Sequence, residues 1–296
     1  MADLLGLMSS FSSLLCCMCP VAKPHASVGE RRRVHMPPAL HTTLSDPKER
    51  VIIVGDVHGC LDELNGLLEA CKYTEERDTV ILVGDLVNKG PKSAGVVAAA
   101  RTNGFLAVRG NHDDSLLFAL ERREAARARG HLSHLSHLSH LSHLSHLSRD
   151  EQDKYAHADE LSAEDAQYLR SLPYTISLPT LGALVVHAGL VPGVALEAQD
   201  PAGMITMRNL VRGGLSYAWT DKPAHGTPWA DEWRGAAHVY FGHDAKRGLQ
   251  QCDHATGLDT GCCYGGSLSA IVLPERRLVQ VPALRTYTEP GERGKG

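Results

Sequence analysis

The sequence lacks a surplus of positive charge and any long apolar run. Its 296 residues carry 30 basic and 34 acidic side chains, which gives a formal net charge of −4. That balance excludes a protein that binds double-stranded DNA through bulk positive charge. The most apolar stretch, LLGLMSSFSSLLCCMCPVA, is interrupted by serines and falls short of the ~18 consecutive apolar residues of a membrane-spanning helix. The sequence therefore excludes a polytopic membrane protein and predicts no transmembrane segment.

A regular cysteine pattern is also missing. The eight cysteines lack the spacing of a disulfide framework or of paired zinc knuckles, since they stand at positions 16, 17, 19, 60, 71, 252, 262 and 263. We therefore expect a reducing compartment and a cytoplasmic location.

Residues 1–48 differ from the rest of the chain. They contain only three acidic residues, several serines and the run Arg31-Arg32-Arg33. We expect a disordered or targeting appendage, and the composition leaves open a mitochondrial address or an acyl anchor on the cysteines at 16, 17 and 19. Ala2 stands where N-myristoylation would require a glycine, so that modification is excluded. At the other end, residues 286–296 are expected to form a flexible tail.

From residue 51 onward, short β-branched runs end in glycine-containing loops: VIIVGDVHG, TVILVGDLV and FLAVRGNHD. Such runs are typical of buried strands. Between them lie LDELNGLLEACKY, with leucines at helical spacing, and PKSAGVVAAARTNG, which opens with proline and closes with glycine as helices do. The alternation predicts an α/β fold with a βαβ core. Further strands are expected in ALVVHAGL, HVYFGHD, SLSAIVLP and LVQVPA.

Residues 131–148 are six consecutive copies of His-Leu-Ser. A three-residue repeat matches neither the helical nor the strand period, so it cannot keep its leucines on one buried face. We interpret it as a mobile insert. Its six histidines could chelate metal loosely, but a tract without fixed geometry makes a poor specific site.

Side chains of metal-ligand type follow five of the expected strands. They are Asp56, His58, Asp85, Asn111, His187 and His243. Each one taken alone could cap a turn or sit in the core. Together, at loop tips presented by a sheet, carboxylate, amide and imidazole groups are how a dinuclear site is assembled, with two ions ~3.5–4 Å apart.

The motifs GDVHG, GDLVNKGP, GNHD, HAG and GHD resemble the calcineurin-like metallophosphoesterase superfamily, in its phosphoprotein-phosphatase branch. The resemblance covers about residues 51–283 apart from the insert. GDLVNKGPKS, VVHAGLVPGV, MRNL, FGHDAKRGLQ and ATGLDTGCCYGG are similar to the ApaH-like phosphatases, relatives of bacterial symmetrical dinucleoside tetraphosphatase. The resemblance implies a catalytic domain over residues 49–285, with a β-sandwich flanked by helices and a metal site at strand-end loops.

The resemblance also implies roles for individual residues. Two divalent ions (manganese, zinc, iron or cobalt) would bind, the first to Asp56, His58 and Asp85. The second would bind Asp85, which bridges, together with Asn111, His187 and His243. His112 fits the general acid, because the pKa of histidine lies near working pH. Beyond what the resemblance implies, a phosphate needs positive charge in addition to the metals. We expect Lys89, Arg208 and Arg247 to supply it, while Arg109 and Lys246 could equally be structural.

One motif departs from the protein phosphatases of the branch. Their second motif reads GDxVDRG, whereas Asn88 and Lys89 replace the aspartate and arginine here. An asparagine does not stabilise a charged imidazole, and a lysine offers a point charge instead of a planar fork. Both changes favour a substrate with a good leaving group, such as a phosphoanhydride.

Three functions remain open at this stage. The first is hydrolysis of phosphoanhydrides in a dinucleoside polyphosphate, inorganic polyphosphate or a capped RNA end. The second is a serine/threonine protein phosphatase, because the metal centre is indifferent to what carries the phosphate. The third is a non-catalytic scaffold, which is disfavoured because no expected metal ligand is missing.

The insert gives the first testable prediction. Deletion of residues 131–148 should leave the hydrolytic rate within about tenfold of the intact chain, because an unpatterned tract cannot form part of the core. Steady-state rates of the two proteins would check this. A larger loss would mean that the insert covers or orders the site.

Overall fold

The computed structural model describes residues 34–130, 156–214 and 216–290. The targeting signals expected near the amino terminus and the His-Leu-Ser insert lie outside these residues. No helix within the described ranges has both the length and the apolar character that crossing a membrane requires.

One of the two central sheets has five strands in the order β14-β13-β2-β3-β4. The βαβ core predicted from the sequence forms its parallel part, because β2, β3 and β4 run parallel while β13 pairs antiparallel with β2 and β14. The strands are β2 (Arg50–Val54), β3 (Asp78–Leu82), β4 (Leu106–Ala107), β13 (Ser267–Leu273) and β14 (Arg277–Pro282).

The other central sheet has six strands in the order β1-β5-β6-β10-β12-β11. It is mixed, since β6, β10 and β12 are parallel and β5 and β11 run antiparallel to their neighbours β6 and β12. Its strands are β1 (His41–Thr43), β5 (Thr175–Leu178), β6 (Ala183–Val186), β10 (His238–Phe241), β11 (Gln250–Gln251) and β12 (Ala255–Gly257).

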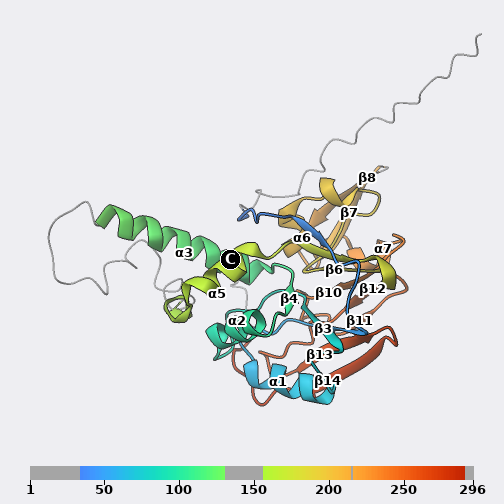
Figure 1. Cartoon of the computed structure of the whole chain (residues 1–296). Helices are drawn as coiled ribbons and strands as arrows, with labels where there is room; N and C mark the ends of the chain where they lie inside the picture. Colours follow the sequence, from blue (N-terminus) through green and yellow to red (C-terminus); the bar gives the residue numbers. More distant parts are fainter. Residues whose placement is uncertain (1–33, 131–155, 215, 291–296) are drawn as a thin grey trace, which may run out of the picture.

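The two sheets pack face to face, and the alternation of side chains along each strand sets the layers (Figure 1). In β2, Val51 and Ile53 point into the core between the sheets, whereas Ile52 and Val54 point to the outer face. That outer face is covered by α1 (Leu61–Ala70), α2 (Ser93–Thr102), α3 (Asn111–Gly130) and α5 (Ala163–Ser171). The α/β sandwich flanked by helices that the sequence predicted is therefore confirmed.

A third layer covers the far side of the six-stranded sheet, and the sequence analysis did not predict it. Three short strands in the order β8-β7-β9 pack there with two helices and the tryptophans Trp219 and Trp229. The elements are α6 (Pro201–Thr206), β7 (Asn209–Gly213), β8 (Ser216–Thr220), β9 (Thr227–Pro228) and α7 (Trp229–Glu232). The described residues also include three short 3₁₀ helices: Ala156–Glu160, Pro179–Leu181 and Leu196–Ala198.

The structure extends the folded part beyond both expected boundaries. In the segment expected as an appendage, β1 pairs in parallel with β5, Val34 packs on the core, and the backbone N–H groups of His35 and Lys48 donate to Asp114 and Thr79, so residues 34–48 belong to the fold. In the expected tail, the Tyr287 hydroxyl donates to Glu63 Oε1 at 2.8 Å, and Thr286 forms a bridge with Tyr264. Both segments are held by partners distant in the sequence, which composition alone does not reveal.

Arg109, left open between a catalytic and a structural role, is structural. Its side chain is fully buried, and its guanidinium donates to the carbonyls of Leu169 (3.1 Å), Arg170 (2.7 Å) and His35. The carboxylate of Asp114 lies 3.8 Å away. Arg109 thus ties the end of α5 and the amino-terminal segment to the loop that precedes α3.

Replacing this cation should be costly. We expect Arg109→Met to lower the free energy of unfolding by about 3 kcal/mol, because it removes a buried positive charge 3.8 Å from the buried carboxylate of Asp114 and leaves the carbonyls of Leu169 and Arg170 without its guanidinium. The control is Arg101→Met, since Arg101 pairs with Asp165 but is 34% exposed, and it should cost less than about 1 kcal/mol. Urea denaturation measures both, and equal losses would contradict the assignment.

Candidate metal centre

The six predicted ligand residues meet at the carboxyl ends of the strands of the two sheets. Asp56 and His58 follow β2, Asp85 follows β3 and Asn111 opens α3, while His187 follows β6 and His243 follows β10. Sheet packing brings these ends to one edge of the sandwich, so residues up to 187 positions apart in the sequence come into contact.

Asp85 lies at the middle of the group. Its carboxylate oxygens lie 3.5 Å from Nε2 of His58 and 3.5 Å from Nε2 of His187. Asn111 Oδ1 lies 3.1 Å from His187 Nε2 and 2.9 Å from His243 Nδ1. Asp56 accepts the backbone N–H of His243 at 3.1 and 3.2 Å. The contacts thus form one cluster with Asp85 shared between its two halves.

Each ligand histidine is held by a backbone carbonyl on its outer side. Val87 O lies 3.0 Å from Nδ1 of His58 and Val83 O 2.8 Å from Nδ1 of His187, whereas Thr206 O lies 3.1 Å from Nε2 of His243. A carbonyl only accepts, so that ring nitrogen must be the donor. The other ring nitrogen then directs its lone pair toward the cluster, which is how a hydrogen bond on the outer side orients a histidine that binds a metal.

The three rings are neutral as well as oriented. Burial lowers the pKa of His187 to about 4. Burial also lowers the pKa of His58 and His243, and the nearby charges of Lys89 and Arg208 respectively lower them further. Because a metal ion binds only neutral imidazole, the environment favours the form that can be a ligand.

The carboxylates show the complementary effect. Burial, followed by the charges of Asp259 and Asp85, raises the pKa of Asp56 well above its usual range. Burial likewise raises the pKa of Asp259, although Lys89 opposes the shift. Carboxylates crowded without a cation are costly, and divalent ions remove that cost. The donor set therefore fits a divalent metal centre.

Asp259 was not singled out by the sequence analysis. It comes two residues after β12, lines the same cavity as His58 and Asp85, and is 5% exposed. The sequence contained a signal for Asp259, because it follows the strand β12 within two residues, as Asp56 follows β2.

The backbone of the site is strained. Five of its residues have φ in the left-handed region: His58 (45°), Asp85 (53°), Asn88 (70°), Lys89 (71°) and His243 (69°). Only two other non-glycine residues in the described ranges do so, Lys72 and Arg276. Such conformations cost of order 1 kcal/mol each and persist where the surrounding structure enforces them. Four of the five, His58, Asp85, Lys89 and His243, line one cavity.

Two glycines permit the close approach of the motif loops. A Cβ atom at Gly110 would collide with Asp85 Oδ1, and one at Gly242 would collide with Asp56 Oδ1. Any other residue would push a carboxylate of the cluster out of place.

Asp113, for which the sequence indicated no role, holds together the loops that carry Asp85 and Gly110. It is fully buried and accepts the backbone N–H groups of Asp85, Leu86 and Gly110, each at 2.9 Å. One side chain therefore fixes both the second and the third motif.

His112, the predicted general acid, lies at the edge of the cluster. Its backbone N–H donates to Asp85 Oδ1 at 2.8 Å, and its ring stands edge-on to His58 with centroids 4.9 Å apart. Its Nδ1 lies 3.0 Å from the side-chain nitrogen of Asn88. His112 also faces the cavity, where a substrate would lie.

The cavity above the cluster measures about 460 Å³ and includes two of the three predicted phosphate-binding residues, Lys89 and Arg208. Lys89 Nζ lies 2.7 Å from Nε2 of His58 and 5.2 Å from the centre of the Tyr264 ring. Arg247 is not part of the lining. Its guanidinium is paired with Asp244 and donates to Asn209 Oδ1 at 2.7 Å.

The model of the family described as calcineurin-like phosphoesterase matches residues 49–251. The chain belongs to this family. A symmetrical bis(5'-nucleosyl)-tetraphosphatase of Methylobacillus flagellatus is 30% identical over 77% of the chain and 94% of its own length. A crystal structure assigned provisionally as a diadenosine tetraphosphatase has a TM-score of 0.69 and 37% identity, covering 83% of this chain and 98% of its own.

The calcineurin-like phosphoesterases include protein phosphatases as well. Serine/threonine-protein phosphatase 1 of Salmonella typhimurium is 27% identical over 74% of the chain and 89% of its own length. Membership confirms the resemblance inferred from the motifs and identifies the protein as a metal-dependent phosphohydrolase.

Candidate ligand atoms lie within 4.8 Å of one another in two groups that share Asp85, one with Asp56 and His187 and one with His58 and His112.

The position of Asp113 leads to a prediction. In Asp113→Asn, an amide NH₂ would replace one of the two oxygens that accept backbone N–H groups, so the loops should shift. We expect the free energy of unfolding to fall by about 2 kcal/mol and Mn²⁺ affinity to fall by about tenfold.

Titration calorimetry with Mn²⁺ and urea denaturation would measure these effects. The control is Asp62→Asn on α1, since Asp62 is half exposed and pairs only with Lys92 among the described residues. Unchanged metal affinity in Asp113→Asn would show that the loops keep their places without it.

Proposed function

We propose that the protein hydrolyses a phosphoanhydride bond of a dinucleoside tetraphosphate with two divalent ions. The observation that carries the proposal is the position of Asp85, whose oxygens face His58 on one side and His187 on the other. The similarity to proteins named as bis(5'-nucleosyl)-tetraphosphatases supports the substrate.

Asp56, His58 and Asp85 would hold one ion, and Asp85 would share the second with Asn111, His187 and His243. Bound divalent ions supply Lewis-acid polarisation of the phosphate and acidify water. The ligands suit manganese, zinc, iron or cobalt alike. The chain's own contribution is to orient these side chains, and to keep the three histidines neutral, before the substrate arrives.

His112 would donate the proton to the departing oxygen. Its partner Asn88 is 2% exposed, and the Oδ1 atom of that amide has no hydrogen-bond partner among the described residues. The amide of Asn88 orients the imidazole ring of His112. An aspartate in its place would also stabilise the charged imidazolium, which an amide does not do. The support that Asn88 gives is therefore weaker than that of an aspartate, which suits a phosphate leaving group because it needs less assistance than a serine alkoxide.

Lys89 and Arg208 would neutralise the phosphate beside the metal centre. Burial opposes the charge of Lys89, but the Asp85 carboxylate and the Tyr264 ring outweigh it, so its pKa is raised and the ammonium stays charged. Arg208 is held by the carbonyl oxygens of His243 (3.2 Å) and Asp221 (3.4 Å), which orients its guanidinium at the cavity wall.

A serine/threonine protein phosphatase is the second candidate, supported by the Salmonella relative. Inorganic polyphosphate and a capped RNA end are further anhydride substrates that the same chemistry would accept.

Product analysis tests the proposal. Manganese- or zinc-loaded protein would be offered diadenosine tetraphosphate, long-chain polyphosphate and a phosphoserine peptide in parallel. We expect cleavage of the tetraphosphate, with loss of at least about a thousandfold in Asp85→Asn, because removal of a shared charged ligand disrupts both ion sites. Turnover of the peptide alone would overturn the proposal and favour the protein phosphatase.

A further inference from the structure

Lys246 lies at the rim of the cavity, in the loop that follows His243. Successive turns fix the backbone of this loop: Asp244 N–H donates to Gly242 O at 2.8 Å, Arg247 N–H to Asp244 O at 2.9 Å, and Gly248 N–H to Ala245 O at 3.2 Å. The lysine therefore leaves a well-defined loop attached directly to a predicted metal ligand, and it contributes to the lining of the cavity.

The acidic neighbour of Lys246 is already neutralised. Asp244 forms an ion pair with Arg247, and its other oxygen lies 3.5 Å from Nε of Arg208. Across the described residues, the ammonium of Lys246 takes part in no ion pair or hydrogen bond, and its side chain is exposed. The ammonium of Lys246 is therefore not needed to neutralise the acidic side chain of its own loop.

The cations of the cavity are graded in depth. Lys89 contacts His58 at the floor, the side chain of Arg208 is 17% exposed, and Lys246 stands at the exposed mouth. A phosphomonoester needs neutralisation only at the floor, where its single phosphate reacts. A chain of phosphates carries further negative charge outward, toward the mouth.

We propose that Lys246 forms a subsite for a phosphate of an oligophosphate chain that lies beyond the scissile one, next to Arg208. This inference rests on the proposed function, since it names the residue that distinguishes an oligophosphate from a phosphomonoester at the same metal centre. The binding energy would come from an ion pair between Lys246 and a phosphate at the mouth of the cavity. This ion pair strengthens binding of the oligophosphate more than it changes the rate of the chemical step.

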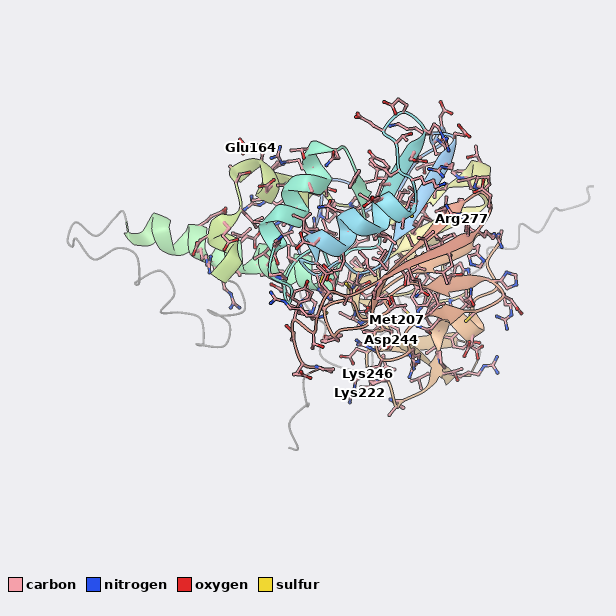
Figure 2. The ribbon with its side chains drawn as sticks, turned by 90° about the horizontal axis from the view of Figure 1, so that it is seen from below. Glu164, Met207, Lys222, Asp244, Lys246 and Arg277 are labelled. Atoms are coloured by element: carbon pink, nitrogen blue, oxygen red, sulfur yellow. The ribbon has the colours of Figure 1, made fainter. Side chains whose placement is uncertain are left out.

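The test compares Lys246→Gln with Lys222→Gln in the metal-loaded full chain. Both lysines lie on the same side of the molecule, with Asp244 nearby (Figure 2), but Lys222 does not line the cavity. Each variant removes one positive charge. The comparison therefore separates a direct contact between Lys246 and the substrate from the effect of positive charge anywhere on this side of the molecule. Two substrates are used, diadenosine tetraphosphate and p-nitrophenyl phosphate, together with a methylene-bridged tetraphosphate analogue as an inhibitor.

In Lys246→Gln we expect KM for the tetraphosphate and the inhibition constant of the analogue to rise about fivefold, while kcat changes little. The ratio of kcat/KM for the tetraphosphate to kcat/KM for p-nitrophenyl phosphate should fall by the same factor, and high salt should shrink the difference. Lys222→Gln should change none of these quantities.

An unchanged inhibition constant in Lys246→Gln would overturn the inference, as would an equal loss for both substrates or an equal effect of Lys222→Gln. Failure of the proposed function has another signature. The wild-type protein would then cleave p-nitrophenyl phosphate but leave the tetraphosphate intact, and inhibition by the analogue would still decide the role of Lys246.

Discussion

The carboxylate of Asp85 lies 3.5 Å from a nitrogen of His58 and 3.5 Å from a nitrogen of His187, and it accepts the backbone N–H of His112. The rest of the site depends on this placement. Asp113 holds the backbone on both sides of it, and Gly110 leaves room for its oxygen. The negative charge of a shared carboxylate offsets the repulsion between two cations that bind on either side of it.

Rigidity for this arrangement comes from the sandwich. The inner faces of β2, β3, β6 and β10 are filled by β-branched and aromatic side chains with almost no exposure. Five site residues adopt left-handed backbone conformations on that base. Because a packed sheet resists local relaxation, it can hold several strained loops at once, and the strain keeps the ligands oriented before a metal ion binds.

The charge distribution relates the fold to its substrate. Buried acids and neutral histidines gather at the floor, and cations of increasing exposure follow toward the mouth. The replacement of an aspartate by Asn88 beside His112 belongs to the same pattern, because less help for the leaving group is needed when that group is itself a phosphate. Departures from the protein-phosphatase motif and the cations of the cavity thus both support the proposed oligophosphate substrate.

The sequence by itself determined the βαβ core, the family and the six ligand-type residues at the strand ends. These follow from local patterns, since β-branched runs, flanking glycines and motif spacing are short-range features. Only the tertiary structure decided that Arg109 and Arg247 are occupied by other partners, and that Asp113 and Asp259 turn toward the centre. It also placed β1 and Tyr287 inside the fold. The reason is physical: whether a charged side chain is neutralised or available depends on how the whole fold places its partners. Asp244 stands only three residues from Arg247, but Asn209, which accepts from the same guanidinium, is 38 residues away, and Arg109 donates to carbonyls 60 and 61 residues away.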